Sequence, residues 1–163
     1  MVGASYFVLK GELPAWVLYS SLPYALGVTS VLFGKHIDKI EEDSRKGIRT
    51  LPVILKERNA RTAALLIVAL MYLFTVALVI TGHLAVTLLL VFLAIPTARL
   101  TTRALLRPKP SSPPEGYPKD AWPLWFVGFT FVHNRSFGAL FMLGLLVDVV
   151  LRFMGFTLTI TLV

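Results

Sequence analysis

The chain has 163 residues, of which 56% are hydrophobic and 15% are charged, and its mean hydropathy is +0.74. Because soluble domains usually carry about 25% charged residues, this composition argues against a soluble domain and indicates an integral membrane protein. The net charge is +7, and the lysines and arginines lie beside apolar runs, which argues against nucleic-acid binding. The absence of cysteine excludes disulfides and a cysteine nucleophile.

The N-terminal third of the chain predicts a short apolar stub and one membrane span. Residues 1–9 are mostly apolar, lack the features of a signal peptide, and are typical of the end of a helix whose beginning is missing. The first predicted span covers 13–34, with Pro14 at a tolerated first-turn position and Pro23 where it should kink the helix. A polar segment follows over 35–61.

Two further spans and a loop are predicted in the middle of the chain. Residues 62–81 carry no charged side chain and end at a Gly-His turn, and residues 84–98 return and run on towards Arg107. Residues 108–119 are rich in Pro, Ser and Gly, and this composition predicts a loop.

The last apolar region admits two arrangements. It is either a short interfacial segment over 122–132 followed by a span over 137–150, or one long tilted helix. The polar run 133–135 interrupts it, and we expect these side chains to anchor at the interface or pack between helices, or alternatively to lie near a substrate. The spacing of Asp148 and Arg152 predicts a structural ion pair.

These segments together predict an all-α, multi-spanning transmembrane helical bundle of about four spans, with 1–163 as a single transmembrane unit. Lysines and arginines gather after the first and third spans, whereas the turn between the second and third has none. Both basic loops are therefore expected to face the cytoplasm of a bacterial or archaeal cell membrane.

The polar segment begins with a dense run of carboxylates. Asp38, Glu41, Glu42 and Asp43 are four of the nine acidic residues in the chain. On a helix the first three share a face, whereas Asp43 lies further round and joins them only if the helix ends there. Clustered carboxylates of this kind suit Mg²⁺, which proteins usually hold by one or two carboxylates together with substrate phosphates.

Basic residues surround this acidic run. Arg45, Lys46 and Arg49 follow it, Lys35 precedes it, and Gly47 permits a close turn at a helix end. Arginine suits bidentate phosphate contacts, so the pattern indicates a site for a diphosphate that carries an apolar tail and is bridged by Mg²⁺. The alternative is a mixed-charge juxtamembrane loop that stays solvated and only sets topology.

The order of these residues resembles a known motif. Residues 38–52 resemble the second aspartate-rich motif of the UbiA superfamily of intramembrane prenyltransferases, most closely over 43–52. Residues 35–39 look like one bacterial branch of that family, and 122–126 and 132–135 look like its C-terminal helices.

The resemblance implies a fold, a reaction and roles for particular residues. Family members have nine transmembrane helices around a cavity, where two aspartate-rich motifs hold Mg²⁺ on an isoprenyl diphosphate. Its ionisation leaves an allylic carbocation that alkylates an aromatic or other lipophilic acceptor. By the match, Asp38, Glu42 and Asp43 would be metal ligands, with Asp38 and Asp43 catalytic, while Lys46 and Arg49 would contact the diphosphate. Lys35 and Arg45 would be further substrate-binding cations.

Two departures from the family pattern shape the hypotheses. Lys39 stands where the family has an aspartate and Asp38 lies one position earlier, so either the helical register or the ligand set must differ, with Glu42 as the candidate replacement. The first aspartate-rich motif has no counterpart, so the chain is expected to be the C-terminal half of the fold, either a fragment or a chain that pairs with the missing N-terminal half. The competing hypotheses are a non-catalytic membrane fragment or accessory subunit and, ranked lowest, a small cation transporter.

Overall fold

The structure is a computed structural model that describes residues 2–157, apart from the side chain of Lys119. Every regular element in this range is helical, which confirms the all-α prediction. In chain order the elements are α1 (Val2–Lys10), α2 (Ala15–Asp38), α3 (Ile40–Arg45), α4 (Leu51–Ile80), the 3₁₀ helix η1 (Val86–Ala94), α5 (Ile95–Leu105), the short 3₁₀ helix η2 (Lys119–Ala121) and α6 (Phe126–Phe153).

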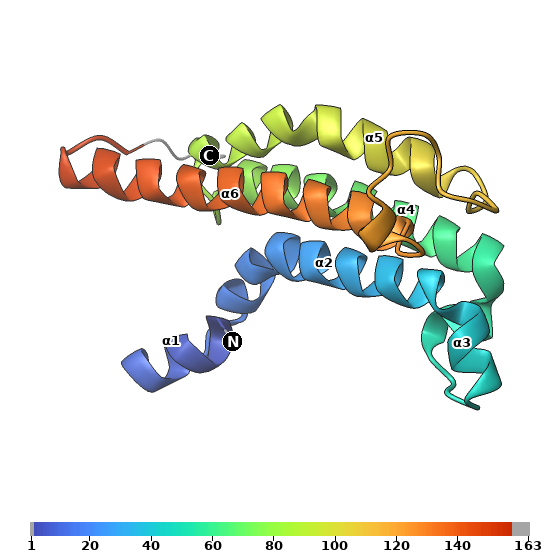
Figure 1. Cartoon of the computed structure of the whole chain (residues 1–163). Helices are drawn as coiled ribbons and strands as arrows, with labels where there is room; N and C mark the ends of the chain where they lie inside the picture. Colours follow the sequence, from blue (N-terminus) through green and yellow to red (C-terminus); the bar gives the residue numbers. More distant parts are fainter. Residues whose placement is uncertain (1, 158–163) are drawn as a thin grey trace.

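Four helical segments are long and apolar enough to cross a membrane: α2, α4, η1 with α5, and α6. Figure 1 shows them side by side, with α3 at the end of α2 and α1 diverging from the bundle. Large apolar side chains cover their outer faces, and Leu73 on α4 is 62% exposed while Leu146 on α6 is 59% exposed. Such a surface suits lipid, which confirms the predicted multi-pass membrane bundle.

The helices pack around two apolar clusters. The larger is built around Met71, Leu88 and Phe137, and the smaller around Ile37, Ala60, Leu105 and Phe126. The smaller cluster joins the end of α2 to the beginnings of α4 and α6 and to the end of α5. Ile40, in the acidic and basic segment, packs against this cluster.

The approach of α2 to α6 depends on Gly34. A Cβ atom on this residue would collide with the hydroxyl of Thr130 and lie 3.0 Å from both the carbonyl oxygen of Phe126 and the Cα of Val127. Two of these neighbours are backbone atoms, which cannot turn aside as a side chain can. A residue without a side chain is therefore required where the two spans meet.

The segment 35–61, predicted as polar, is mostly helical. Helix α2 continues to Asp38, α3 follows at once, and α4 begins at Leu51, eleven residues before the predicted start at Thr62. Charged residues need only to leave the hydrocarbon, and a helix that extends beyond it keeps its backbone hydrogen bonds. Within α4, Lys56 has a φ of +62°, which marks a kink between the polar start and the apolar span.

The last apolar region is one continuous helix, α6, which confirms the second of the two predicted arrangements. His133 does not break it, because the side chain is buried between helices, stacked 5.8 Å from Tyr72 and 3.3 Å from the hydroxyl of Thr97. The predicted ion pair of Asp148 with Arg152 is present at 2.9 Å. The third span differs from the prediction in beginning as a 3₁₀ helix, η1.

Both basic segments lie at one end of the bundle. The guanidinium of Arg61 donates a hydrogen bond to the carbonyl of Leu105 at 3.0 Å, and the end of α2 contacts the start of α6. The turn after α4 lies at the other end, as Figure 1 shows. The two basic segments therefore lie at the same end of the helical bundle.

Candidate functional site

The acidic and basic segment is shaped by a tight turn at the end of α3. Gly47 has a φ of +71°, its N–H donates to the carbonyl of Ser44 at 3.2 Å, and the N–H of Ile48 donates to the carbonyl of Asp43 at 2.9 Å. This pair of bonds satisfies carbonyls at the helix end, and glycine adopts the required conformation without a Cβ penalty. The predicted role of Gly47 is confirmed.

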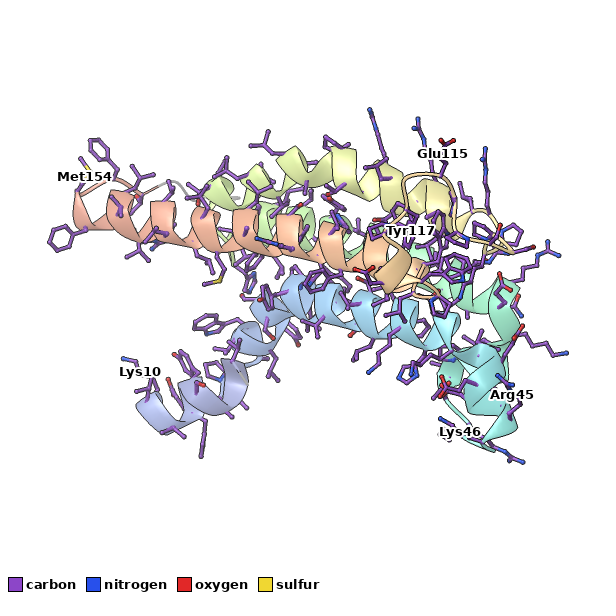
Figure 2. All side chains as sticks on the ribbon, viewed as in Figure 1. Lys10, Arg45, Lys46, Glu115, Tyr117 and Met154 are labelled. Carbon is purple, nitrogen blue, oxygen red and sulfur yellow. The ribbon has the colours of Figure 1, made fainter. Side chains whose placement is uncertain are left out.

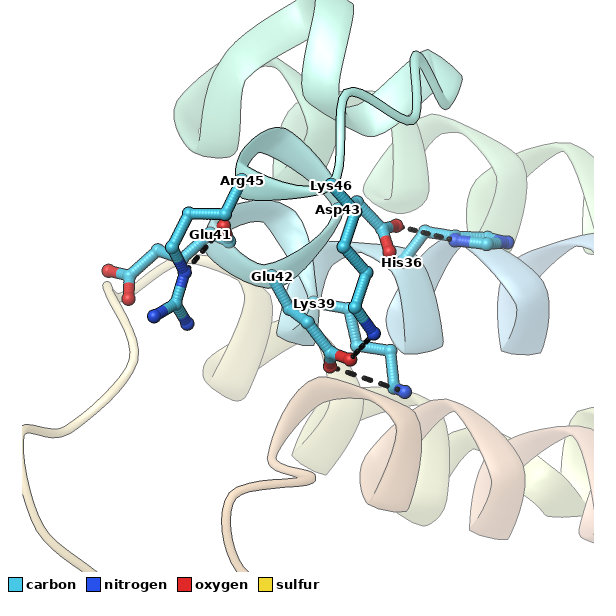
Figure 3. Close-up of polar contacts among 7 residues, drawn as sticks. All are labelled: His36, Lys39, Glu41, Glu42, Asp43, Arg45 and Lys46. Carbon is cyan, nitrogen blue, oxygen red and sulfur yellow. Dashed lines mark hydrogen bonds and ion pairs between the residues drawn. The ribbon is translucent and has the colours of Figure 1, made fainter.

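Asp43 ties α3 back to α2. Its carboxylate lies 3.3 Å from the ring nitrogen Nδ1 of His36, and the residue is only 8% exposed. Figure 3 shows this contact beside the other polar contacts of α3. The sequence indicated no role for His36, because its partner stands two turns away across the break between two helices.

Glu42 lies between two lysines on the exposed side of α3. Its carboxylate accepts a hydrogen bond from Lys46 and lies 3.5 Å from the ammonium of Lys39 (Figure 3). The hydrogen bond from Lys46, followed by the attraction of Lys39, holds the pKa of Glu42 below its ordinary value of 4.5. Glu42 is therefore an ionised carboxylate already supplied with counter-ions.

The predicted phosphate-binding cations are accessible. Arg45, Lys46 and Arg49 are exposed at the end of α3 and in the turn to α4, and Lys35 is exposed on α2. Figure 2 shows Arg45 and Lys46 on α3, at one end of the bundle. Of these, Lys46 is already shared with Glu42, and Arg45 donates to the carbonyl of Glu41 at 3.4 Å. They form a cationic rim, a name used below for Arg45, Lys46 and Arg49.

Asp38 is engaged elsewhere. Its side chain is fully buried, and its two oxygens accept hydrogen bonds from the main-chain N–H groups of Phe126 at 3.0 Å and Val127 at 2.9 Å. Lys109 approaches the same carboxylate at 3.9 Å. The first N–H groups of a helix have no partner within it, so Asp38 caps α6 from another helix and faces the positive end of its dipole.

A polar cavity of about 520 Å³ opens beside Asp38, between the end of α2, the start of α3, the first turns of α4 and the loop before α6. Its polar lining includes Glu41 and Glu57, and Lys109 lies 5.1 Å from the ring centre of Trp122. The sequence did not single out Glu57, Lys109 or Trp122 as site residues. Each comes from a different segment, and no local spacing connects them.

The three predicted metal ligands are not brought together. Asp38 faces α6, whereas Glu42 and Asp43 lie on α3 and are paired with lysines and with His36. Over residues 2–157, no group of three or more His, Asp or Glu side chains is arranged to hold a metal ion. The described residues therefore do not fit a complete Mg²⁺ site, and the predicted ligand set stays a prediction.

Comparison with known proteins identifies the class of the chain. A match to the UbiA prenyltransferase family covers residues 1–116, which include the whole acidic and basic segment. The chain belongs to the UbiA prenyltransferase family.

Among characterised relatives, the chain is 28% identical over 147 residues to the 1,4-dihydroxy-2-naphthoate octaprenyltransferase of Bacillus subtilis (strain 168). The alignment covers 88% of this chain and 43% of that protein, so the chain spans less than half the length of its relative. No solved structure matches it.

Proposed function

We propose that this chain is the C-terminal half of a UbiA-type prenyltransferase, which transfers an isoprenyl group from an isoprenyl diphosphate to an aromatic acceptor. The observation that carries the proposal is the cationic rim, held at the end of apolar spans by the contact of His36 with Asp43. Family membership and the naphthoate named for the relative support an aromatic acceptor.

The rim suits the diphosphate because it offers two guanidiniums and an ammonium within a short, turn-stabilised segment. Arg45 and Arg49 can each give two parallel N–H bonds to phosphate oxygens, and Lys46 adds a compact charge. Lys35, one turn before the end of α2, is a fourth proposed contact. The isoprenyl tail then extends along the apolar spans.

The reaction needs a charged leaving group and a dry cavity. The allylic C–O bond breaks and its electron pair leaves with the diphosphate, whose growing negative charge the rim stabilises. A carbon of the acceptor ring then bonds to the allylic carbon, and the ring loses a proton. Apolar helices keep water from the carbocation, which would otherwise be hydrolysed.

Mg²⁺ dependence is part of the proposal. Glu42 and Asp43 are the carboxylates of this chain that we propose as partial ligands, with the remaining ligands supplied from outside it. Asp38, predicted as a ligand and catalytic residue, we instead propose to hold α6 against α2, since both of its oxygens are occupied. Mutation separates these two roles, as described in the Discussion.

The site is proposed to face the cytoplasm of a bacterial or archaeal cell. The lysines and arginines of both long loops lie at the same end of the bundle as the rim, and such loops remain on the cytoplasmic side during insertion. An Arg49→Cys variant in sealed, right-side-out vesicles tests this orientation. The introduced cysteine should react with a thiol label that cannot cross the membrane only after the vesicles are opened.

Binding of radiolabelled geranyl diphosphate to the native gene product in detergent, with and without Mg²⁺, tests the function. Lys46→Gln and Arg49→Gln are each expected to weaken binding about tenfold, the loss of one charge-assisted contact. Arg58→Gln removes the same charge from an exposed position on α4 and is the matched control. Binding that is equal in all three variants, or absent in every form, would favour a non-catalytic membrane module.

A further inference from the structure

A basic pocket lies at the end of α5, and no residue of the cationic rim lines it. Its volume is about 630 Å³, and it is bounded by α5, the loop that follows and the start of α6. Arg103 and Arg107 line it, together with the aromatic rings of Trp125 and Phe129. Within the described part of the chain, neither arginine has an ion-pair partner.

An apolar groove continues from this pocket along the outside of the bundle. It has a volume of about 410 Å³, lies between α5, α6 and the segment 117–121, and shares Leu100 and Phe129 with the basic pocket. Its lining is almost wholly apolar. Leu100 is 50% exposed and Val132 is 51% exposed, so the groove opens to the surroundings of the bundle rather than to its interior.

The two cavities together match an amphiphile with an anionic head and an apolar tail. A head group on Arg103 and Arg107 would lie at the end of the third candidate span, which covers Val86–Leu105. A tail in the groove would then run along Leu100 and Val132 into the bilayer. Basic pockets at this level between spanning helices suit anionic lipid head groups.

We propose that this pocket binds an anionic membrane phospholipid, with its phosphodiester on Arg103 and Arg107 and one acyl chain in the groove between α5 and α6. The competing amphiphile is an isoprenyl diphosphate. An isoprenyl diphosphate carries several negative charges and is normally held with a metal ion. The described lining of this pocket includes no carboxylate that could bind such an ion. Two guanidiniums and no acid suit the single charge of a phosphodiester.

Native mass spectrometry of the native gene product tests the proposal by counting lipids retained when phosphatidylglycerol or phosphatidylcholine is added. The unmodified protein should retain phosphatidylglycerol in preference to phosphatidylcholine. The double variant Arg103→Gln with Arg107→Gln should retain about tenfold less phosphatidylglycerol. Arg99→Gln, one turn earlier on α5 and outside the pocket, is the matched control and should retain it fully.

Two further variants keep the test decisive if the double variant does not fold. Arg103→Lys with Arg107→Lys keeps both charges and should retain most of the lipid. Val132→Trp fills the groove with both arginines intact and should reduce retention. Equal retention of the two lipids, or an equal loss in Arg99→Gln, would show that these arginines only set topology and would overturn the proposal.

A third arm with geranyl diphosphate separates this pocket from the cationic rim. Its binding should be unchanged in the double arginine variant, because no residue of α2 or α3 lines the pocket. Loss of geranyl diphosphate binding there, with phosphatidylglycerol retained, would assign the pocket to the diphosphate and overturn the lipid assignment. The lipid proposal therefore stands or falls independently of the proposed function.

Discussion

The carboxylate of Asp38 accepts a hydrogen bond from the main-chain N–H of Phe126, 88 positions later in the chain, at 3.0 Å. Through this contact the first acid of the aspartate-rich segment holds the beginning of the last span. The segment thus divides into a structural part at the end of α2 and an exposed, ionic part on α3.

Asp38→Ala should lower the free energy of unfolding by about 2–3 kcal/mol, because it leaves two partly buried N–H groups of α6 without an acceptor. Asp38→Asn keeps one carbonyl oxygen and should cost less. Thermal unfolding in detergent measures the effect, with Glu41→Ala on the exposed face of α3 as the control. If Asp38→Ala is as stable as that control, the cap does not hold α6.

Asp43→Asn should affect catalysis more than stability, whereas substitution of Asp38 should affect stability more than catalysis. If Asp43 is a ligand of the Mg²⁺ that binds the diphosphate, its loss should lower kcat for prenyl transfer about 100-fold, the usual scale for removing one electrostatic contact in an active site. Asp38→Asn should leave kcat per folded molecule nearly unchanged. Equal losses of kcat in the two variants, without a loss of stability in either, would return Asp38 to the catalytic role implied by the family resemblance.

Glu42 should titrate below 4.5, since Lys46 and Lys39 favour its charged form. A carboxylate whose pKa is lowered by folding stabilises the fold above the unfolded pKa. That contribution is lost as the pH falls through the lowered value. An NMR titration of labelled glutamate side chains measures it, and Lys46→Gln should move the pKa of Glu42 upwards, towards 4.5. Arg58→Gln should not move it, and a shift in both variants would point to a general effect of net charge.

Gly34→Ala should destabilise the packing of α2 on α6 by about 1–3 kcal/mol, because the added methyl meets backbone atoms of Phe126 and Val127. Gly27→Ala is the informative comparison. Its methyl meets the ends of the Asn134 and Met71 side chains, which can turn away, so the cost should be smaller. Thermal unfolding of the two variants compares them, and equal costs would mean that the helices do not meet at Gly34.

Much of the fold follows from local patterns. The charge-free run 62–81 predicted most of the apolar part of α4, and the prediction of four spans is confirmed. The spacing of Asp148 and Arg152 predicted their ion pair, and Gly47 predicted the turn after α3. These features depend on residues within a few positions of one another, where helical geometry alone sets the distance.

The extent of the helices was less well predicted than their number. Hydropathy marks where a helix enters hydrocarbon, and it does not mark where the helix ends. Both α2 and α4 therefore continue into the segment that composition indicated as polar. For the same reason the polar run at His133 suggested a break in α6, whereas burial against Tyr72 and Thr97 lets the helix continue.

By itself the sequence determined the membrane character of this protein and the number of its spans. It also indicated that the two basic segments lie at one end of the bundle and, through residues 38–52, the family. Only the tertiary structure decided what each charge does. The sequence predicted Asp38 as a metal ligand, whereas the approach of Phe126 and Lys109 from distant segments gives its carboxylate partners at the start of α6. A carboxylate takes its role from the donors around it, and long-range packing, which no local spacing encodes, brings those donors to it.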